Sequence, residues 1–386
     1  MRFLFVIKSF AQVAGVERVM ADKMNYLASS GHTIMLITYE QGNHPLVFDL
    51  IPDINHIDLN CRFFTLIKQS WPKRLFYSYI MRKRFLNKIK RIVETFKPNA
   101  IISPTYPLTV VGELISAKGN ARIIFESHMT YIQALKEYNK QRSYIIKIIA
   151  KIYDLSTLRK LSKCDCLAVL TKGDCNFWKK YIQNTVVLPN PLTKFPDKIN
   201  DVRKDNNRII SIGRLTHIKR FDRLIDAFAL ISEFNHNWHI DIYGEGSDKN
   251  KLIDKITKFD LNNRIKIHSP TNDIYTEMKK SQILVMTSES EGFPLVLIEA
   301  MACGIPCISF DCPYGPGEII EHNKNGLLVK DGDIKDLANN IKYLMNNPNI
   351  VNSMGLNARI SATQYQKDKI MKSWEQLYTE GANEKQ

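Results

Sequence analysis

Short apolar runs alternate with amphipathic stretches along the chain, which is the pattern of β-strands alternating with α-helices. In the first half the predicted strands are Arg2–Lys8, Thr33–Thr38, Ala100–Ser103, Arg122–Phe125, Cys166–Leu170 and Thr185–Leu188. Helical stretches such as Val16–Ala28 and Leu75–Phe96 lie between them. Strand, helix and strand in repeated succession predict a parallel sheet covered by helices.

A polar segment with three prolines interrupts this alternation between Leu188 and Arg208. The second set of predicted strands is Arg208–Ile212, Trp238–Tyr243, Arg264–Ile267, Ile283–Met286 and Pro306–Phe310, with helices beginning at Phe221, Ser247, Asp273 and Leu295. We therefore expect an α/β protein in which two doubly wound, Rossmann-like domains face each other across a cleft lined by the loops at the strand ends. The expected domains are residues 1–190, residues 191–362 and a C-terminal helical segment, 363–386, that packs back on the first domain.

The most informative stretch is Ser288–Pro306, in which Glu291 and Glu299 lie eight residues apart. Because Ile283–Met286 predicts a buried strand and proline favours the first helical position, we expect a strand, a loop and a helix that begins at Pro294. Glu291 would lie in the loop and Glu299 in the helix. A helix start favours an anion such as a diphosphate, and a carboxylate set back from it can accept hydrogen bonds from ribose hydroxyls.

Two cations form a second candidate element. Arg214 and Lys219 follow Gly213 at the end of a predicted strand. A planar fork and a point charge together suit a diphosphate. Two loop cations are ordinary solvated charges when they stand alone, but their place at a strand end, in the same domain as the carboxylate loop, favours a phosphate role. Gly244, after another strand, is compatible with either a tight turn or a nucleotide contact.

The net charge of +15 is concentrated in one half of this 386-residue chain. Residues 1–190 hold 28 Lys and Arg against 13 Asp and Glu, whereas residues 191–386 hold 26 of each kind. This asymmetry indicates that the first half faces something anionic. The seven cysteines lack the paired spacing of zinc sites, so we expect reduced, mostly buried thiols of a cytosolic protein. No apolar run approaches the roughly 20 residues of a membrane span.

The residues from Glu291 to Gly304, together with Gly213-Arg214 and Lys219, resemble the retaining nucleotide-sugar glycosyltransferases of family four, which have the GT-B fold. Ala14–Arg18 is similar to the family's glycine loop, and Glu126-Ser127-His128 to its histidine after a later strand. Leu188–Pro191 is similar to its interdomain Asn-Pro. The resemblance covers nearly the whole chain. One position departs from it, since the family's usual Lys-Gly is here Lys219-Arg220.

The resemblance implies a role for each matching residue. Arg214 and Lys219 would bind the donor diphosphate, and Glu299 the ribose hydroxyls. Glu291 would contact the transferred sugar, and His128 would hydrogen-bond it. The expected catalytic residues are His128, Glu291, Arg214 and Lys219, and the expected donor-binding residues are Gly15, Asn190, Gly213, Arg214, Lys219, Gly244, Glu291, Gly292, Phe293, Pro294, Leu295 and Glu299.

The expected chemistry needs no cofactor and no metal. Negative charge builds on the leaving nucleoside diphosphate, where fixed cations and helix N–H groups stabilise the transition state more than the ground state. The nearest metal-like pair, Asp331 and Asp333, precedes a helical pattern from Ile334 to Met345, so Asp333 is expected to cap that helix. Retention of anomeric configuration is implied by the resemblance alone.

The acceptor is inferred from the basic first half. Residues 62–97 and 136–163 interleave Lys and Arg with aromatic and aliphatic side chains, which is typical of helices that lie on an anionic bilayer. The alternative is amphipathic helices packed on the sheet with solvated cations outside. We expect a lipid-linked or oligosaccharide acceptor and peripheral association with the cytosolic face of the inner membrane.

Other functions remain open. A nucleic-acid binder would use the basic patch but leave the Glu291 and Arg214 elements unexplained. A dinucleotide-dependent oxidoreductase needs a complete Gly-x-Gly-x-x-Gly, which the chain lacks, and a nonenzymatic membrane adaptor would not need intact site residues. Among donors, the stretch Cys312–Ile320 resembles polysaccharide transferases that use UDP-sugars, with GDP-mannose as the runner-up.

Overall fold

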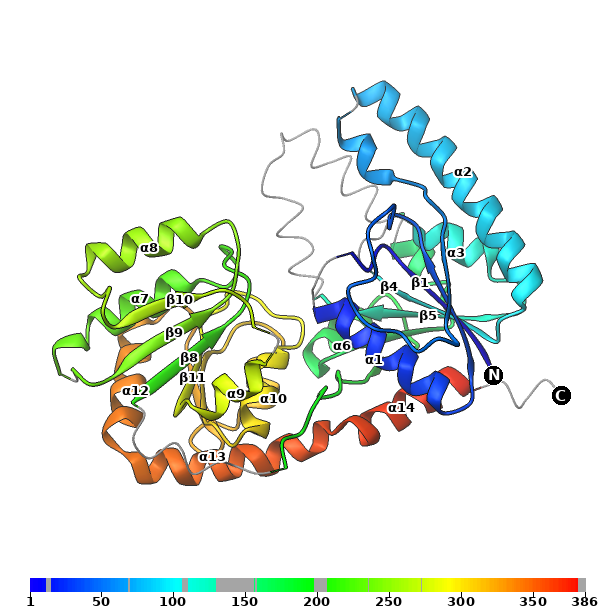
Figure 1. Cartoon of the computed structure of the whole chain (residues 1–386). Coiled ribbons are helices and arrows are strands. Elements are labelled where there is room, and N and C mark those ends of the chain that lie inside the picture. The colour runs from blue at the N-terminus through cyan, green and yellow to red at the C-terminus, as the bar shows by residue number, and fades with distance from the viewer. Residues whose placement is uncertain are drawn as a thin grey trace. The chain divides into compact units, whose positions relative to one another are not determined.

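The computed structural model describes residues 1–11, 15–68, 70–105, 110–129, 156, 158–197, 207–234, 236–271 and 273–380. The chain divides into two compact units. Unit 1 consists of Met1–Pro191 and Asp368–Gln386, and unit 2 of Leu192–Lys367. Each unit has its own parallel sheet (Figure 1), which confirms the predicted fold class of two Rossmann-like domains.

The sheet of unit 1 has seven strands in the order β3-β2-β1-β4-β5-β6-β7, and every neighbouring pair is parallel. The strands are β1 (Arg2–Ile7), β2 (Thr33–Thr38), β3 (Asn55–Asp58), β4 (Ala100–Pro104), β5 (Arg122–Ser127), β6 (Cys166–Val169) and β7 (Thr185–Val187). The pattern did not predict β3, because this edge strand is half exposed and has only one strongly apolar residue, Ile57. β5 extends two residues beyond its predicted end and includes Glu126.

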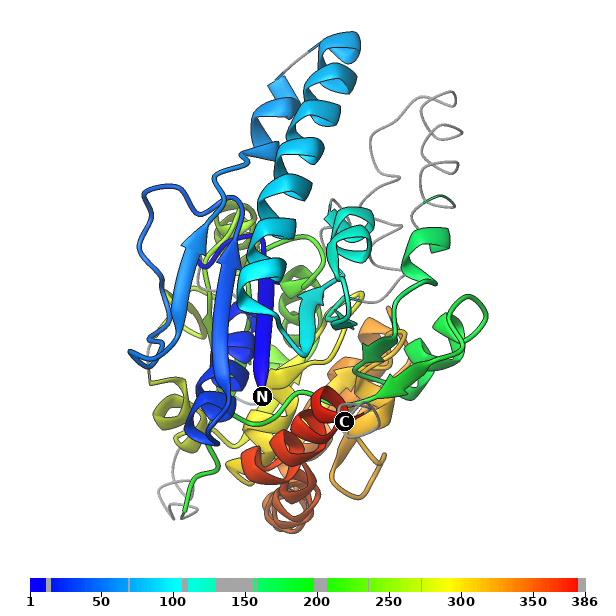
Figure 2. The ribbon, with the colours of Figure 1, turned by 90° about the vertical axis from the view of Figure 1, so that its right-hand side faces the viewer.

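Helices cover both faces of this sheet (Figure 2). They are α1 (Gly15–Ser29), α2 (Trp71–Phe96), α3 (Val111–Ala117), α6 (Lys172–Trp178) and α14 (Lys367–Thr379), with a 3₁₀ turn at Phe63–Lys68. α14 lies beside α1 although it comes from the other end of the chain (Figure 1). Glu375 of α14 lies 2.8 Å from His32, and Trp374 Nε1 donates to the carbonyl oxygen of Pro189 over 3.0 Å.

Unit 2 has a six-stranded parallel sheet in the order β10-β9-β8-β11-β12-β13. Its strands are β8 (Arg208–Ile212), β9 (His239–Tyr243), β10 (Ile265–His268), β11 (Ile283–Met286), β12 (Cys307–Phe310) and β13 (Gly326–Val329). Its helices are α7 (Phe221–Ala229), α8 (Lys249–Lys258), α9 (Ile274–Lys279), α10 (Leu295–Ala302), α11 (Pro316–Ile319), α12 (Ile334–Asn346) and α13 (Pro348–Ala362), with 3₁₀ turns at Ser232–Phe234 and Thr363–Tyr365.

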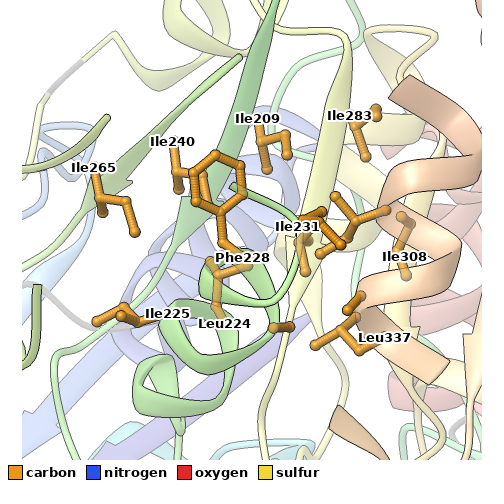
Figure 3. Packing of buried hydrophobic residues seen from close by; sticks show 14 of the residues in the cluster. Ile209, Leu224, Ile225, Phe228, Ile231, Ile240, Ile265, Ile283, Ile308 and Leu337 are labelled. Carbon is orange, nitrogen blue, oxygen red and sulfur yellow. The ribbon is translucent and has the colours of Figure 1, made fainter. Parts of the chain in front are cut away.

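The core of unit 2 forms where α7 and α12 pack on one face of the sheet. Figure 3 shows Leu224, Ile225 and Phe228 of α7 lying against isoleucines that project from the strands. All three are fully buried. The apolar face of α7 recurs at helical spacing, and isoleucines of the strands face it, so apolar residues from both layers meet along one contact surface.

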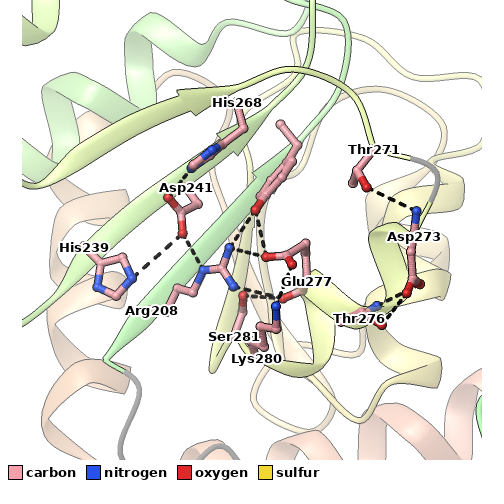
Figure 4. A network of polar contacts seen from close by, with 11 residues as sticks. Arg208, His239, Asp241, His268, Thr271, Asp273, Thr276, Glu277, Lys280 and Ser281 are labelled. Carbon is pink, nitrogen blue, oxygen red and sulfur yellow. Dashed lines mark hydrogen bonds and ion pairs between the residues drawn. The ribbon is translucent and has the colours of Figure 1, made fainter.

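A polar network ties the first two strands of this unit to α9 (Figure 4). Arg208 at the start of β8 lies 2.5 Å from Asp241 and 2.8 Å from Glu277, and it donates to the hydroxyl of Tyr243 over 2.9 Å. The Tyr243 hydroxyl donates to Glu277 over 2.8 Å, and His268 lies 2.6 Å from Asp241. Burial tends to raise the pKa of Glu277, but its bonds to Lys280, Arg208 and Tyr243 hold it at about 2. These charges satisfy one another and connect β8, β9 and β10 with α9.

The predicted helix starts of unit 2 lie within two residues of the observed ones. α8 begins at Lys249 and not at Ser247, because Asp248 N donates to the carbonyl oxygen of Leu215 and fixes the loop until that point. Of the two positions predicted for the start of α10, Leu295 is confirmed, and Pro294 precedes the helix because its ψ of 86° is not helical. In the C-terminal segment that was expected to be helical, a 3₁₀ turn precedes α14, because Gln366 has an extended ψ of 141°.

Candidate active site

The strand order of unit 2 reverses between β8 and β11. In open parallel sheets, ligands bind beyond the carboxyl ends of the strands at such a reversal. β8 ends at Ile212 and leads directly into Gly213 and Arg214, and β11 ends at Met286 and leads into the loop of Glu291. The two predicted donor-binding loops therefore leave neighbouring strands at the reversal.

An ion pair joins these two loops. Lys219 Nζ lies 2.6 Å from Glu291 Oε1, and the two side chains are 22% and 9% exposed. The backbones are tied as well, because Thr287 Oγ1 donates to the carbonyl oxygen of Lys219 over 3.1 Å and Glu289 N donates to that of Ile218 over 2.8 Å. Two sequence motifs about 70 residues apart thus form one structural element with a cation and a carboxylate in contact.

Arg214 supplies a second cation from the same loop. Its side chain is exposed, and within the described ranges its guanidinium makes no hydrogen bond or ion pair. A guanidinium without a protein partner is available for a two-pronged contact with a phosphate or carboxylate. Among the described residues, the loop therefore offers Lys219 as a cation that is already paired and Arg214 as a cation without a partner.

Arg220 explains the departure from the family's usual Lys-Gly. This residue has a φ of 49°, in the left-handed region that glycine adopts without strain. Its side chain lies 2.9 Å from Asp222 and 3.8 Å from Glu289. These contacts hold a non-glycine residue in that conformation, and Lys219 keeps its contact with Glu291.

α10 places the predicted ribose-binding carboxylate. Glu299 lies in the second turn of this helix and is 5% exposed. The helix is apolar on nearly all sides, so it is fixed by burial all around and not by a single face. Of the loop residues before it, Gly292 precedes Phe293, whose ring packs edge-on against that of Tyr365 with centroids 5.7 Å apart.

Close backbone contacts explain two of the glycines beside this site. A Cβ atom on Gly244 would lie 2.0 Å from the carbonyl oxygen of Gly213, and one on Gly246 would lie 2.4 Å from that of Leu215. No side chain fits at these distances. The pair Gly244 and Gly246 is therefore required for the approach of the β8 and β9 loops, whether or not a nucleotide also contacts them.

The predicted residues of unit 1 lie in three different elements. Gly15 is the exposed first residue of α1, and Ala14, the first residue of its motif, lies outside the described residues. Asn190 follows β7 and is buried, and its Oδ1 has no hydrogen-bond partner among the described residues. His128 follows β5 directly.

His128 belongs to a buried polar cluster. Its Nε2 lies 2.9 Å from Glu126 Oε2, and its side chain is only 4% exposed. The same carboxylate oxygen lies 2.6 Å from Lys23 Nζ, and both of these side chains are fully buried. The hydroxyl of Tyr378 donates to Glu126 Oε1. Lys23 Nζ also lies 3.0 Å from the centroid of the Trp374 ring, so α14 contributes two side chains to the cluster.

Burial and charge act against each other in this cluster. Burial lowers the pKa of Lys23 to about 8, although Glu126 favours its charged form. Burial would raise the pKa of Glu126, but Lys23 and His128 hold it at about 2. The pKa of His128 is lowered by burial, and the charge of Lys23 adds to this effect while Glu126 opposes it. At neutral pH the cluster therefore holds an ionised Lys23–Glu126 pair next to a neutral imidazole.

Sequence reasoning missed the other members of this cluster, which are Lys23, Glu126, Trp374 and Tyr378. The available signal was Glu126 itself, because a carboxylate that continues an apolar strand must find buried partners. Its partners come from elements 103 and 252 residues away along the chain, and no local pattern connects them.

All seven cysteines are free thiols and six are buried, in agreement with the expectation that most of them lie in the interior. Cys312 is a neighbour of the Lys219–Glu291 pair, and burial together with the charge of Glu291 raises its pKa to about 12.

Asp333 accepts a hydrogen bond from Asp336 N and caps α12 as expected, while Asp331 lies 2.6 Å from Arg223. The described residues contain no cluster of three or more potential metal ligands among His, Cys, Asp and Glu.

The first basic stretch corresponds largely to α2. Phe76 and Tyr79 are more than 60% exposed, and Lys83, Arg84 and Arg91 line a hollow of about 460 Å³ together with Tyr79. Two cations of the stretch are engaged elsewhere, however. Arg82 lies 2.9 Å from Glu113, and Lys88 donates to the carbonyl oxygen of Leu59 over 2.6 Å. The second stretch, residues 136–163, lies mostly outside the described residues.

None of the helices that the structure describes combines the length and the apolar character of a membrane span.

Two family models match successive parts of the chain. The model for Glycosyltransferase Family 4 matches residues 13–193, and that for Glycosyl transferases group 1 matches residues 194–361. The chain belongs to the family 4 glycosyltransferases. The second match contains the complete Arg214, Lys219, Glu291 and Glu299 set, and the first contains Gly15, His128 and Asn190.

Two curated relatives place this family 4 chain among similar proteins. An uncharacterized glycosyltransferase of Haemophilus influenzae is 25% identical over 372 residues, which cover 96% of this chain and 98% of that protein. The poly(ribitol-phosphate) alpha-N-acetylglucosaminyltransferase of Staphylococcus aureus is 28% identical over 260 residues, which cover 66% of this chain and 50% of that protein.

Two solved glycosyltransferase structures share the fold. The lipopolysaccharide outer core galactosyltransferase WaaB, in its apo form, has a TM-score of 0.74 and 18% identity, covering 97% of this chain and 98% of WaaB. A mutant of S. aureus TarM in complex with fondaparinux, alpha-GlcNAc-glycerol and UDP has a TM-score of 0.75 and 17% identity, covering 98% of this chain and 100% of TarM. At these identities the likeness shows the GT-B fold.

Proposed function

We propose that this glycosyltransferase moves a hexose or N-acetylhexosamine, with retention, from a UDP-sugar to a lipid-linked or polysaccharide acceptor of a cell-surface glycan. The observation that carries the proposal is the Lys219–Glu291 contact at the strand-order reversal, with Arg214, which has no partner in the described part of the chain, on the same loop. Two cations at this position suit the diphosphate of the donor. Support for the donor and acceptor class comes from the UDP bound to TarM and from the lipopolysaccharide named for WaaB.

Each residue has a separate task in this proposal. Arg214 and Lys219 bind the diphosphate and stabilise the charge that develops on it as the glycosidic bond breaks. The N-terminus of α10 adds N–H groups and a favourable dipole to the same anion. Glu291, held by Lys219, contacts the transferred sugar, and Glu299 accepts hydrogen bonds from the ribose. The two cations take the part that a divalent ion has in other transferases, so the reaction requires no metal.

Nucleotide binding tests the donor site. Titration calorimetry with UDP and GDP, in the presence of EDTA, is expected to give binding that Arg214→Ala and Glu299→Ala each weaken by about tenfold or more, since each removes a charge-assisted contact. Lys251→Ala is the matched control, because this exposed lysine of α8 lies in the same unit outside the site. Wild-type affinity in both site variants would refute the assignment. Tighter binding of GDP than of UDP would instead support GDP-mannose as the donor.

Turnover tests the chemistry. A panel of UDP- and GDP-sugars is incubated with the enzyme, and release of the nucleoside diphosphate identifies the donor. Proton NMR of the transferred sugar then reports its anomeric configuration, for which we expect that of the donor. Inverted product would overturn the retaining assignment, and loss of turnover in EDTA that Mg²⁺ restores would overturn metal independence.

We also propose that unit 1 associates with the cytosolic face of the inner membrane through α2. The exposed Phe76 and Tyr79 provide apolar contacts, and the exposed Lys83 and Arg84 provide positive charge on the same helix. Each cation near an anionic bilayer contributes about 1 kcal/mol. Lys90 and Arg91 extend the charge along the helix, and within the described residues these four cations have no ion pair.

Flotation with anionic vesicles tests this surface. Neutralising Lys83, Arg84, Lys90 and Arg91 to Gln is expected to abolish co-flotation with phosphatidylglycerol vesicles, because the four together supply roughly 4 kcal/mol of attraction. The control neutralises four exposed lysines of unit 2: Lys251, Lys258, Lys330 and Lys335. Both variants lose the same net charge. Equal flotation of the two would contradict a role for α2.

A further inference from the structure

The loop between β12 and α11 holds a tyrosine in a backbone conformation that favours glycine. Tyr314 has a φ of 58°, in the left-handed region. For a bulky residue this conformation is an outlier, because Cβ comes too close to the following carbonyl oxygen. Glycine, which has no Cβ, adopts the same conformation without strain. The backbone alone would therefore favour a different residue at position 314.

The other non-glycine residues with a positive φ, in the ranges that the structure describes, have local explanations. Three of them are Asn or Asp, which tolerate the left-handed region best. Lys97 ends α2, and the side chains of Arg62 and Arg220 bind to Asn60 and Asp222. The complete set beside Tyr314 is Asn60, Arg62, Lys97, Arg220, Asp260 and Asn323.

The side chain of Tyr314 has no comparable partner in the protein. It is partly buried, yet it makes no hydrogen bond and no aromatic contact with any described residue. Its ring is also absent from the two hydrophobic clusters that the described residues of unit 2 form. Strained residues are retained where a functional contact compensates for the strain. A ligand beside the loop would supply that contact.

The loop of Tyr314 lies next to the carboxylate of the proposed donor site. β12 pairs with β11 in parallel, so the loops that follow the two strands leave the same edge of the sheet side by side. A Cβ atom on Gly315 would lie 3.5 Å from Cβ of Glu291 and 3.1 Å from Cδ of Pro294. Tyr314 therefore precedes the residue that touches the Glu291 loop, and all of these residues belong to unit 2.

The backbone around Tyr314 is restrained on both sides. Pro313 precedes it, and Pro316 follows Gly315 as the first residue of α11. Proline fixes its own φ and limits the residue before it. Glu318 N donates to the carbonyl oxygen of Gly315 over 3.0 Å. A side chain on such a turn is ordered before a ligand arrives, which reduces the entropy lost on binding.

We infer that Tyr314 is a donor-binding residue whose side chain contacts the transferred sugar beside Glu291. This inference rests on the proposed function. An aromatic ring offers an apolar face to the C–H groups of a sugar, and a phenol hydroxyl can both donate and accept a hydrogen bond. Glycine would relieve the strain at this position but would have no side chain for the contact.

The inference predicts that stability and activity change in opposite directions. Tyr314→Ala and Tyr314→Gly both remove the ring, but only glycine removes the strain. In calorimetry without nucleotide, Tyr314→Gly is expected to melt about 2–4 °C above Tyr314→Ala, and Tyr314→Ala within about 2 °C of the wild type. A drop of more than about 5 °C in Tyr314→Ala would show that the ring stabilises the protein itself, and would overturn the inference.

Turnover measures the contact with the sugar. For the donor that the nucleotide-sugar panel identifies, both variants are expected to lose about tenfold or more in kcat/KM, while their affinity for UDP stays within about twofold of the wild type. Wild-type kcat/KM in Tyr314→Ala would overturn the inference. A loss of UDP affinity as large as the loss in kcat/KM would do the same, because it would place the ring at the nucleotide.

Asp260→Gly is the matched control. Asp260 also has a positive φ, of 54°, but it lies between the end of α8 and the start of β10, at the opposite edge of the same sheet. Glycine relieves the backbone there as well, so kcat/KM is expected to remain at the wild-type value. An equal loss of kcat/KM in Asp260→Gly and Tyr314→Gly would show that the added backbone freedom, and not the missing ring, lowers turnover.

The two hypotheses fail in distinguishable ways. Absence of UDP and GDP binding in the wild type would refute the proposed function together with the sugar contact. Normal nucleotide binding and turnover in the wild type, with the same kcat/KM in Tyr314→Ala, would refute the role of Tyr314 alone.

Discussion

The ion pair between Lys23 and Glu126 makes a quantitative prediction about stability. Both side chains are fully buried and their charged atoms lie 2.6 Å apart. Lys23→Met keeps the length of the side chain and its contact with the Trp374 ring but leaves Glu126 as a buried charge without a counterion. Breaking a buried pair in this way costs about 3–5 kcal/mol. For a unit of this size, with about 2–4 °C per kcal/mol, the melting temperature of unit 1 is expected to fall by roughly 10 °C.

The pH dependence supplies a second and independent part of the same prediction. In the wild type the pKa of Glu126 is lowered to about 2, so its stabilising contribution is present above the unfolded pKa and is lost as the pH falls from about 4.5 to 2. In Lys23→Met the largest cause of that lowering is gone, and burial raises the pKa instead. Protonation of Glu126 then removes the unpaired buried charge and so stabilises the variant. The difference in melting temperature between the two proteins should therefore narrow between pH 7 and pH 4.

Scanning calorimetry at both pH values measures these differences. The double variant Lys23→Met/Glu126→Gln is expected to recover most of the loss, because it removes both charges and keeps an acceptor for Tyr378. Lys83→Met, an exposed lysine of the same unit, is the control and should melt within about 1 °C of the wild type. A drop of less than about 2 °C in Lys23→Met, or a difference that widens on acidification, would refute the reasoning.

Three further predictions concern single contacts. Gly244→Ala should weaken UDP binding by about tenfold or more, because its Cβ would lie 2.0 Å from the carbonyl oxygen of Gly213 and displace the β8 loop. The control Gly112→Ala should bind UDP normally, because its Cβ would meet only a flexible lysine side chain. Equal UDP affinity of the two variants in calorimetry would contradict this prediction. Arg208→Met should destabilise unit 2 by about 2–3 kcal/mol, since it leaves Asp241 and Glu277 without their shared cation. Chemical unfolding measures this loss, and an unchanged unfolding midpoint would show that the network does not stabilise the unit. Thr171→Ala removes the side-chain oxygen that caps α6 and should cost about 1 kcal/mol, and Thr171→Ser, which keeps that oxygen, should restore the stability.

The sequence predicted most of the central strands and several of the helices because these are set by local periodicity. β11 is apolar throughout and β1 is apolar after Arg2, as expected for strands of a sheet that is covered on both faces. The edge strand β3 escaped prediction because its exposure leaves it without an apolar pattern. The start of α8 was misplaced by two residues, since a hydrogen bond to the carbonyl oxygen of Leu215 decides it.

The sequence by itself determined which residues follow the carboxyl ends of parallel strands, and such ends lie at one edge of a sheet. That rule placed the Lys219 and Glu291 loops at the same edge, and the structure showed that their strands, β8 and β11, are neighbours. Only the tertiary structure decided that the Lys219 and Glu291 side chains form an ion pair and that His128 contacts Glu126. It also decided that Arg214 has no partner among the described residues. The physical reason is that a buried charge takes its partners from whatever element packs against it, and packing joins residues such as Glu126 and Tyr378 that the chain separates by 252 positions.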